Sequence, residues 1–183
     1  RIAAVNAWGG LPMSKLNKTG AAGAVCSVAV IIGLVLSSGE VKTSRAGLEL
    51  IGNAEGCRRD PYKCPADVWT DGVGNTHGVK PGARKTDQQI AADWKKNIIA
   101  AEQCVIRNAA GDKLRQGAFD AAVSLTFRVG CGTAQKSTLF QLSRQGKVDE
   151  SCEQYPRWVY AAGKVLPGLV TRAGKERALC LAK

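Results

Sequence analysis

Three residues in one short stretch of the chain have the types needed for acid, base and nucleophilic chemistry: Glu55, Cys64 and Thr70. A carboxylic acid can donate a proton to a leaving group. A thiolate can act as a nucleophile or as a negative charge beside a developing cation, and a hydroxyl can hold water or substrate by hydrogen bonds. Each residue also has an ordinary structural alternative, as a surface glutamate, a disulfide cysteine or a strand threonine. Their use therefore depends on the elements that position them.

The segment before Glu55 predicts an α-helix. Its apolar residues recur at helical spacing, at Ala46, Leu48, Leu50, Ile51 and Ala54. Gly56 follows directly and is typical of a helix end. Glu55 is thus expected at a helix C-terminus, where partial desolvation at the edge of a cleft favours a protonated carboxyl group.

The segment after Glu55 predicts two structural regions in turn. Residues 57–82 hold prolines and glycines around short pieces such as Val68-Trp69-Thr70, which indicates a small sheet with tight turns. Thr86 and Gln89 then have the form of a capping box, and a long helical pattern follows to Val105. Further helices are expected over 113–128, 135–145, 149–163 and 172–181. The pattern predicts an α+β protein.

The surroundings of Cys64 leave its role open. Arg58, Arg59 and Lys63 are near in sequence and would favour a thiolate. A disulfide between Cys57 and Cys64 would close a short loop and is equally consistent with the spacing. Carboxylates that could take the second role instead are Asp60, Asp67 and Asp71, of which Asp67 is the best placed.

Composition narrows the compartment and the partners. Seven cysteines indicate a compartment that permits disulfides, and the odd number leaves one thiol over. With the single histidine His77 and no CxxC pair, no metal is expected, and no organic cofactor either. The net charge of +11 favours a polyanionic partner such as a cell envelope, an acidic membrane surface or nucleic acid. Basic residues do not alternate with aromatic ones, so nucleic acid is not expected.

An uncharged apolar segment runs from Thr19 to Gly39 and is long enough, as a helix, to cross a bilayer. Its glycines and serines make insertion weak. Lys15 and Lys18 precede it, which places the N-terminus in the cytoplasm and the chain after Glu40 across the membrane. A cleavable signal peptide is the alternative. Residues 1–12 precede the only methionine, Met13, and are expected to be a non-native leader.

The spacing of Glu55, Cys64 and Thr70 resembles the Glu, Asp-or-Cys, Thr triad of phage-type lysozymes, also called endolysins or muramidases. The resemblance covers about residues 46–183. Other stretches similar to motifs of that family are Gly47-Leu48-Glu49-Leu50-Ile51, Glu55-Gly56, Trp69-Thr70-Asp71-Gly72-Val73-Gly74-Asn75-Thr76-His77-Gly78 and Pro167-Gly168-Leu169-Val170-Thr171-Arg172.

The resemblance implies a two-lobed lysozyme-like fold, with a small antiparallel sheet lobe and a mainly helical lobe, preceded by an N-terminal apolar helix. It implies cleavage between N-acetylmuramic acid and N-acetylglucosamine in bacterial peptidoglycan, with Glu55 as general acid and Thr70 positioning water or substrate. Cys64 stands where many members have Asp, which leaves the second step open between a nucleophile and an electrostatic group. The alternatives are a non-catalytic, membrane-anchored peptidoglycan-binding protein and a lytic transglycosylase.

The segment Thr19 to Gly39, with Cys26, resembles the signal-arrest-release segment of a subclass of endolysins. This implies a protein exported in an inactive form tethered to the host inner membrane and facing the periplasm, then released as a soluble periplasmic monomer. In the tethered form Cys57 would be bonded to Cys64; after release Cys26 would take Cys57 and free Cys64. Cys26 as a small apolar filler is the alternative.

The expected organisation is thus a leader (1–12), a membrane segment with its linker (13–43) and a lysozyme catalytic domain (44–183). Four more cysteines would make two stabilising bridges, and the sequence leaves their pairing open: Cys104, Cys131, Cys152 and Cys180.

Overall fold

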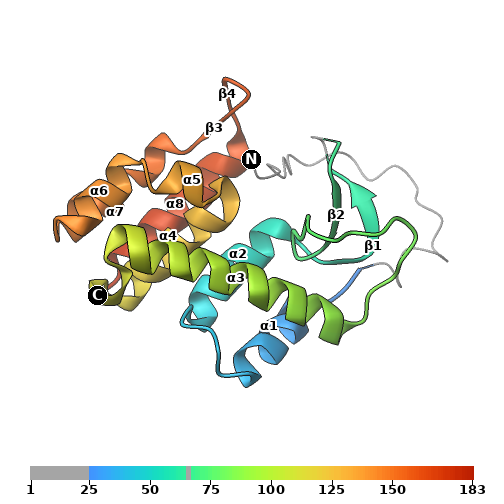
Figure 1. Cartoon of the computed structure of the whole chain (residues 1–183). Coiled ribbons are helices and arrows are strands. Elements are labelled where there is room, and N and C mark those ends of the chain that lie inside the picture. The colour runs from blue at the N-terminus through green and yellow to red at the C-terminus, as the bar shows by residue number, and fades with distance from the viewer. Residues whose placement is uncertain (1–24, 65–66) are drawn as a thin grey trace.

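A long helix, α3 (Asp87–Ala109), connects the two parts of the molecule, a small β-lobe and a larger helical lobe (Figure 1). The computed structural model describes residues 25–64 and 67–183. Helix α3 begins at the predicted capping box: the Thr86 hydroxyl accepts from the Gln89 backbone N–H, and the Thr86 N–H donates to the Gln89 side chain. The local sequence signal is confirmed, because both partners lie within one turn.

The small lobe is built on the antiparallel strands β1 (Arg58–Lys63) and β2 (Trp69–Gly72). Tyr62 lies opposite Thr70, and Lys63 lies opposite Trp69. In the helical lobe, α4 (Gln116–Val129) is buried along most of its length and packs against α3 and α8 (Pro167–Leu181). The shorter helices there are η1 (Gly111–Lys113), α5 (Cys131–Ala134), α6 (Thr138–Arg144), α7 (Val148–Cys152) and η2 (Tyr155–Arg157). The predicted α+β, two-lobed fold is confirmed.

Helix α2 (Arg45–Glu55) runs from the linker to the junction of the lobes and ends where the sequence predicted. Ser44 caps its first turn, and the buried Asp120 of α4 accepts from the Ser44 backbone N–H at 3.0 Å. Gly56 has a φ of +73°, which an L-residue rarely adopts, and it ends the helix directly after Glu55.

Helix α1 (Val28–Ser37) comes from the apolar segment and packs against α3 and α2. Its residues Ile31, Ile32 and Val35 are buried in the same hydrophobic core as the catalytic lobes. The expected leader 1–12 and the first part of the segment, residues 19–24, lie outside the described residues. Among the residues that are described, no helix combines the length and apolarity needed to cross a membrane.

The predicted helix over 149–163 is wrong beyond its first residues. The structure has α7 and η2 there, followed by a hairpin of β3 (Tyr160–Ala161) and β4 (Lys164–Val165). Pro156 cannot continue a helix, and the turn residues Ala162 and Gly163 have φ of 48° and 74°. Helix α8 also begins earlier than expected, with Pro167 in its first turn, a position that tolerates proline.

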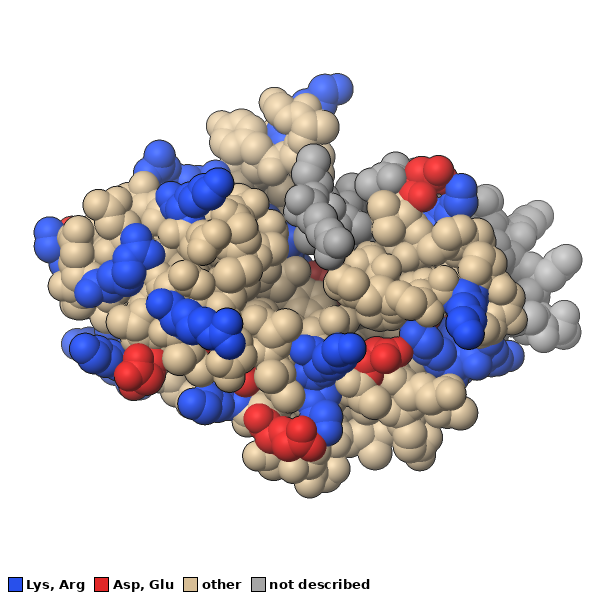
Figure 2. All heavy atoms as spheres, in the orientation of Figure 1, with Lys and Arg blue, Asp and Glu red and all other residues tan. Residues whose placement is uncertain are grey.

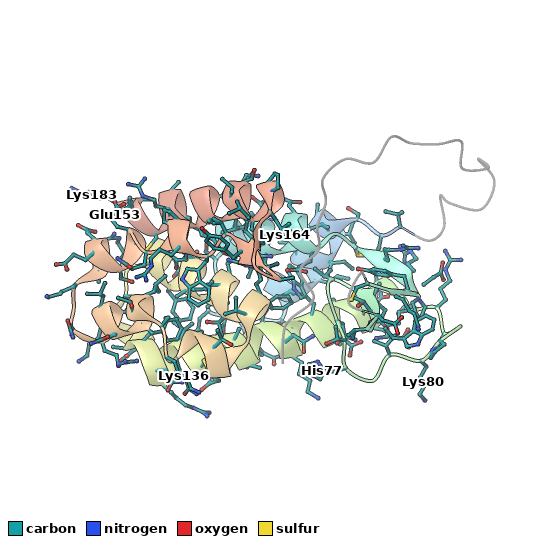
Figure 3. The ribbon with its side chains drawn as sticks, turned by 90° about the horizontal axis from the view of Figure 1, so that it is seen from above. His77, Lys80, Lys136, Glu153, Lys164 and Lys183 are labelled. Atoms are coloured by element: carbon teal, nitrogen blue, oxygen red, sulfur yellow. A yellow bond between two sulfur atoms is a disulfide. The ribbon has the colours of Figure 1, made fainter. Side chains whose placement is uncertain are left out.

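Two disulfides tie the helical lobe together and supply the pairing that the sequence left open. Cys104 of α3 is bonded to Cys131 of α5, and Cys152 of α7 is bonded to Cys180 of α8. In Figure 3, Lys136, Glu153 and Lys183 mark the end of the molecule formed by this lobe, whereas His77 and Lys80 mark the small lobe.

Candidate active site

Glu55 lies at the junction of the two lobes with its side chain only 7% exposed. The Arg172 guanidinium of α8 donates from Nη1 to Glu55 Oε1 at 2.8 Å. On the other side, the backbone of Gly74 packs on the carboxylate, since a Cβ at Gly74 would lie 2.9 Å from Glu55 Oε2. A glutamate at a helix end is usually solvated, so this enclosure marks Glu55 as unusual.

Arg172 belongs to a buried network of charges behind Glu55. Its Nε donates to Glu176 Oε1 at 3.2 Å, and Arg128 Nη2 lies 3.5 Å from Glu176 Oε2. Ser124 completes the network by donating to Glu176 at 2.7 Å. Burial alone would lower the pKa of Arg172, but the charges of Glu55 and Glu176 outweigh it and raise that pKa. Arg172 thus bridges Glu55 and Glu176, and these buried contacts fix the orientation of Glu55.

Cys64 and Thr70 are joined through one backbone carbonyl at the tip of the β1–β2 hairpin. The Cys64 N–H donates to Val68 O at 3.0 Å, and the Thr70 hydroxyl donates to the same oxygen at 3.1 Å. Cys64 is 4% exposed and Thr70 is 1% exposed. Cys64 is the free cysteine of the residues described, while Thr70 fixes the turn that carries it.

Tyr62 is a site residue that the sequence did not reveal. Burial raises the pKa of its phenol, and the negative charges of Glu55 and of Cys64 raise it further, against the opposing charge of Arg58. The phenol therefore stays protonated, as a hydrogen-bond donor, well above neutral pH. Tyr62 thus interacts electrostatically with Glu55 and with Cys64. Its position two residues before Cys64, the spacing of side chains on one face of a strand, was a signal that could have placed it beside Cys64.

The alternative carboxylates have other partners. Asp60 lies 3.7 Å from Arg84 Nε. Asp67 is exposed and pairs with Lys63 at 2.7 Å. Asp71 is buried and pairs with Lys85 at 2.7 Å. Each is thus paired with a lysine or arginine side chain, and none of these pairs involves Glu55.

Cys26 and Cys57 form a disulfide beside the site. Their Cα atoms are 5.1 Å apart, within the usual range for a disulfide, and the Cys26 N–H donates to Cys57 O. Both residues are buried. Cys57 lies two residues after Glu55, so this bond ties the beginning of α1 to the segment between the acid and β1.

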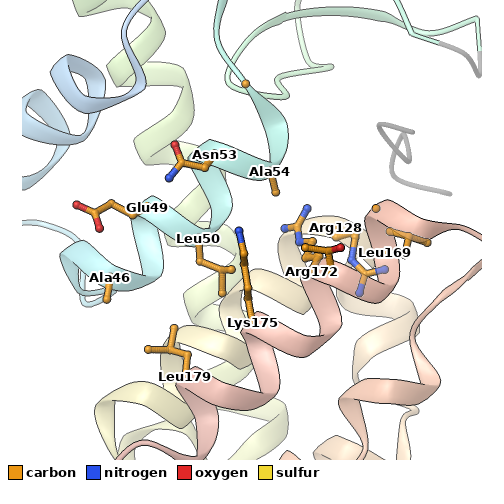
Figure 4. A pocket seen from close by; sticks show the side chains of 13 residues that line it. Ala46, Glu49, Leu50, Asn53, Ala54, Arg128, Leu169, Arg172, Lys175 and Leu179 are labelled. Atoms are coloured by element: carbon orange, nitrogen blue, oxygen red, sulfur yellow. The ribbon is translucent and has the colours of Figure 1, made fainter. Parts of the chain in front are cut away.

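The molecular surface is hollowed between the helical lobe and the β-lobe (Figure 2). A pocket of about 660 Å³ also lies between α2 and α8. Arg128 and Arg172 stand at one end of it, Ala46 and Leu179 at the other, and Lys175 reaches across toward α2 (Figure 4). The charge network behind Glu55 is therefore reached from this pocket as well.

The chain belongs to the phage lysozyme family, which matches residues 52–176. It is thus a peptidoglycan-hydrolysing lysozyme in class. The chain is 49% identical to the SAR-endolysin of Escherichia phage P1 over 177 residues, covering 90% of this chain and 96% of that protein.

Two crystal structures of the P1 phage endolysin Lyz differ in how well they match. The active form superposes with a TM-score of 0.83, at 49% identity, covering 87% of this chain and 96% of that one. The secreted inactive form gives a TM-score of 0.55, at 48% identity, covering 76% and 96%. At nearly equal sequence identity, the present conformation is much closer to the active form.

Proposed function

We propose that this lysozyme cleaves the bond between N-acetylmuramic acid and N-acetylglucosamine, with Glu55 as general acid and Cys64 as the second catalytic group. The observation that carries the proposal is the enclosure of Glu55 between Arg172 and the Gly74 backbone. Such an enclosure holds a carboxyl group in one orientation, as proton transfer to a leaving oxygen requires.

Glu55 and the residues around it then each have a separate role in hydrolysis. Glu55 donates its proton to the glycosidic oxygen as the bond breaks and positive charge develops on the sugar. The Cys64 thiolate faces that charge, either bonding to the anomeric carbon or stabilising it electrostatically. Tyr62 remains a neutral donor near both groups. Thr70 uses its hydrogen on Val68 O, and its oxygen lone pairs remain to accept from water or substrate.

The cysteines support a switch that turns this site on. In the tethered form Cys57 is bonded to Cys64, so that the second catalytic group is blocked. After release, the Cys26 thiolate attacks Cys57 Sγ, a Cys26–Cys57 bond forms, and Cys64 leaves as a thiolate. The exchange is balanced and needs no oxidant. The disulfide Cys26–Cys57 and the free Cys64 are what the final state of this exchange requires.

The same switch accounts for where the protein acts. The inactive form is held in the host inner membrane by the segment Thr19 to Gly39 and faces the periplasm, and the active form is a soluble periplasmic monomer. Helix α1 supports this, because residues expected in the bilayer are buried in the enzyme core. The SAR-endolysin name of the phage P1 relative points the same way.

The test compares Glu55→Gln with Glu49→Gln, an exposed position on the same helix. We expect Glu55→Gln to abolish the release of soluble fragments from purified peptidoglycan, and Glu49→Gln to keep it. Mass spectrometry of the fragments should show reducing N-acetylmuramic acid ends. Anhydro ends would indicate a lytic transglycosylase, and activity in Glu55→Gln would refute the assignment of the acid.

A further inference from the structure

The loop that packs on Glu55 is a closed five-residue turn, residues 71–75. Its ends pair through two backbone hydrogen bonds of 2.9 Å, from Asp71 N to Asn75 O and from Asn75 N to Asp71 O. The Asn75 amide also donates to Asp71 Oδ1 at 2.8 Å. Gly74 has a φ of +65° and faces the acid. The turn is thus internally rigid, and its position depends on what holds it to the rest of the protein.

Helix α3 holds this turn at two points. Asn97 donates from its amide to Asn75 Oδ1 at 3.1 Å. Lys85, just before the helix, places its Nζ 2.7 Å from Asp71 Oδ2 and 2.7 Å from Asp93 Oδ2 on α3. These contacts join two elements that local sequence does not connect.

The Lys85 contact is held firmly by burial. Asp71 is 1% exposed, and a buried carboxylate without a cation is very costly. Burial by itself lowers the pKa of Lys85, but its close ion pairs with Asp71 and Asp93 raise it overall. Lys85 therefore stays charged at neutral pH, and the bridge between turn and helix persists there.

We propose that Lys85 and Asn97 are positioning residues for Glu55. They act by holding the turn 71–75, whose Gly74 packs against the Glu55 carboxyl group. The inference rests on the proposed role of Glu55 and adds two residues whose contacts go to the turn and to α3. Its physical basis is the close packing between Gly74 and Glu55. A Cβ at Gly74 would lie 2.9 Å from Glu55 Oε2, so a small shift of the turn displaces the acid. A displacement of about 1 Å can cost about 100-fold in rate.

The experiment uses the full chain in its released form and initial rates of reducing-end release from solubilised glycan strands. Asn97→Ala should lower kcat about fivefold to tenfold with KM within about twofold, because orientation is lost and binding is not. Lys85→Met should lower kcat about tenfold or more, and Lys85→Arg should recover most of it. In Asn97→Ala and Lys85→Met, the pH at which the rate is half-maximal on the acid side of the pH profile should also shift. A purely structural role of these residues would not produce this shift.

Matched controls separate positioning from general damage. Asn108→Ala removes an asparagine of the same helix that bonds to Cys104 O, and Lys95→Met removes an ion-paired lysine of α3. Both should keep the parent kcat. If Lys85→Met does not fold, Asn97→Ala decides the question alone, since it removes a single hydrogen bond from a partly buried amide.

Two failures remain distinguishable. If the parent releases reducing ends while folded Asn97→Ala and Lys85→Met keep the parent kcat and pH profile, the positioning role is refuted and the lysozyme assignment stands. If the parent releases none, the proposed function itself fails.

Discussion

The disulfide at the small lobe and the two in the helical lobe have similar topologies but different surroundings. They span 31, 27 and 28 residues, so loop-closure entropy predicts about 3.5 kcal/mol of stabilisation for each. Cys57 differs because a third cysteine, the free Cys64, lies at the other end of β1. Within the described residues, neither helical-lobe pair has such a neighbour on its own element. The number of residues that a disulfide spans sets how much it stabilises the fold, whereas a nearby free thiol decides whether it can undergo thiol–disulfide exchange.

The largest expected effect comes from removing the exchange partner. In Cys26→Ser no thiolate can attack Cys57, so Cys57 remains bonded to Cys64. Peptidoglycan clearing should therefore fall about 1,000-fold or more, as when a catalytic group is lost. Brief treatment with a thiol reductant should restore clearing by freeing Cys64. Disulfide mapping by mass spectrometry gives the pairing directly. A Cys26→Ser protein that clears at the parent rate would make Cys26 a core filler.

Removing a helical-lobe disulfide should lower the stability of the protein and leave its activity unchanged. Cys152→Ala combined with Cys180→Ala should lower the free energy of unfolding by about 3.5 kcal/mol but keep the specific activity at 25 °C. Urea unfolding and clearing assays on the same sample would measure both. Loss of activity in a folded double variant would mean that both regions are part of the switch.

A smaller effect tests whether α1 docks by packing as well as by its disulfide. A Cβ at Gly52 would lie 2.6 Å from Val28 Cγ1, so Gly52→Ala should destabilise the protein by about 1–3 kcal/mol despite a better helix propensity. Gly174→Ala, in the open middle of α8, should instead stabilise by up to about 1 kcal/mol. Adding Val28→Ala to Gly52→Ala should recover part of the loss, and a double-mutant cycle would quantify the contact.

The smallest effect is expected at the surface of the helical lobe. Hydrogen bonds from Arg177 lower the pKa of Glu153, so this pair stabilises the folded state above the unfolded pKa of the carboxyl and loses that contribution as the pH falls. Arg177→Ala should lower the melting temperature only slightly at pH 7, because the pair is exposed. The difference should shrink as the pH falls from about 5 to about 3. A difference that grows on acidification would reverse the sign of this linkage.

Local signals in the sequence were sufficient where the determining contacts are local. The capping box at Thr86, the helix end at Glu55 and the small sheet all depend on residues within a few positions of each other. The helix predicted over 149–163 is wrong because Pro156 and the Ala162-Gly163 turn interrupt it. These helix-breaking residues are present in the sequence, and they determine the backbone conformation in this segment.

The site was only partly predictable for the same reason. Glu55, Cys64 and Thr70 carry a recognisable spacing, but Arg172 lies 117 residues from Glu55, and Lys85 contacts the turn through side chains on separate elements. No periodicity encodes such contacts. Tyr62 likewise becomes a site residue only because the fold brings it within electrostatic range of Glu55.

The sequence by itself determined most of the longer helices and the sheet of the small lobe, the set of candidate catalytic residues and the presence of an uncharged apolar segment. The tertiary structure decided that part of this segment, α1, is buried in the core, because apolar side chains are equally satisfied by a bilayer or by the faces of α2 and α3. It also decided which cysteines pair, since bonding requires Cα atoms about 5 to 6 Å apart and only folding brings them there.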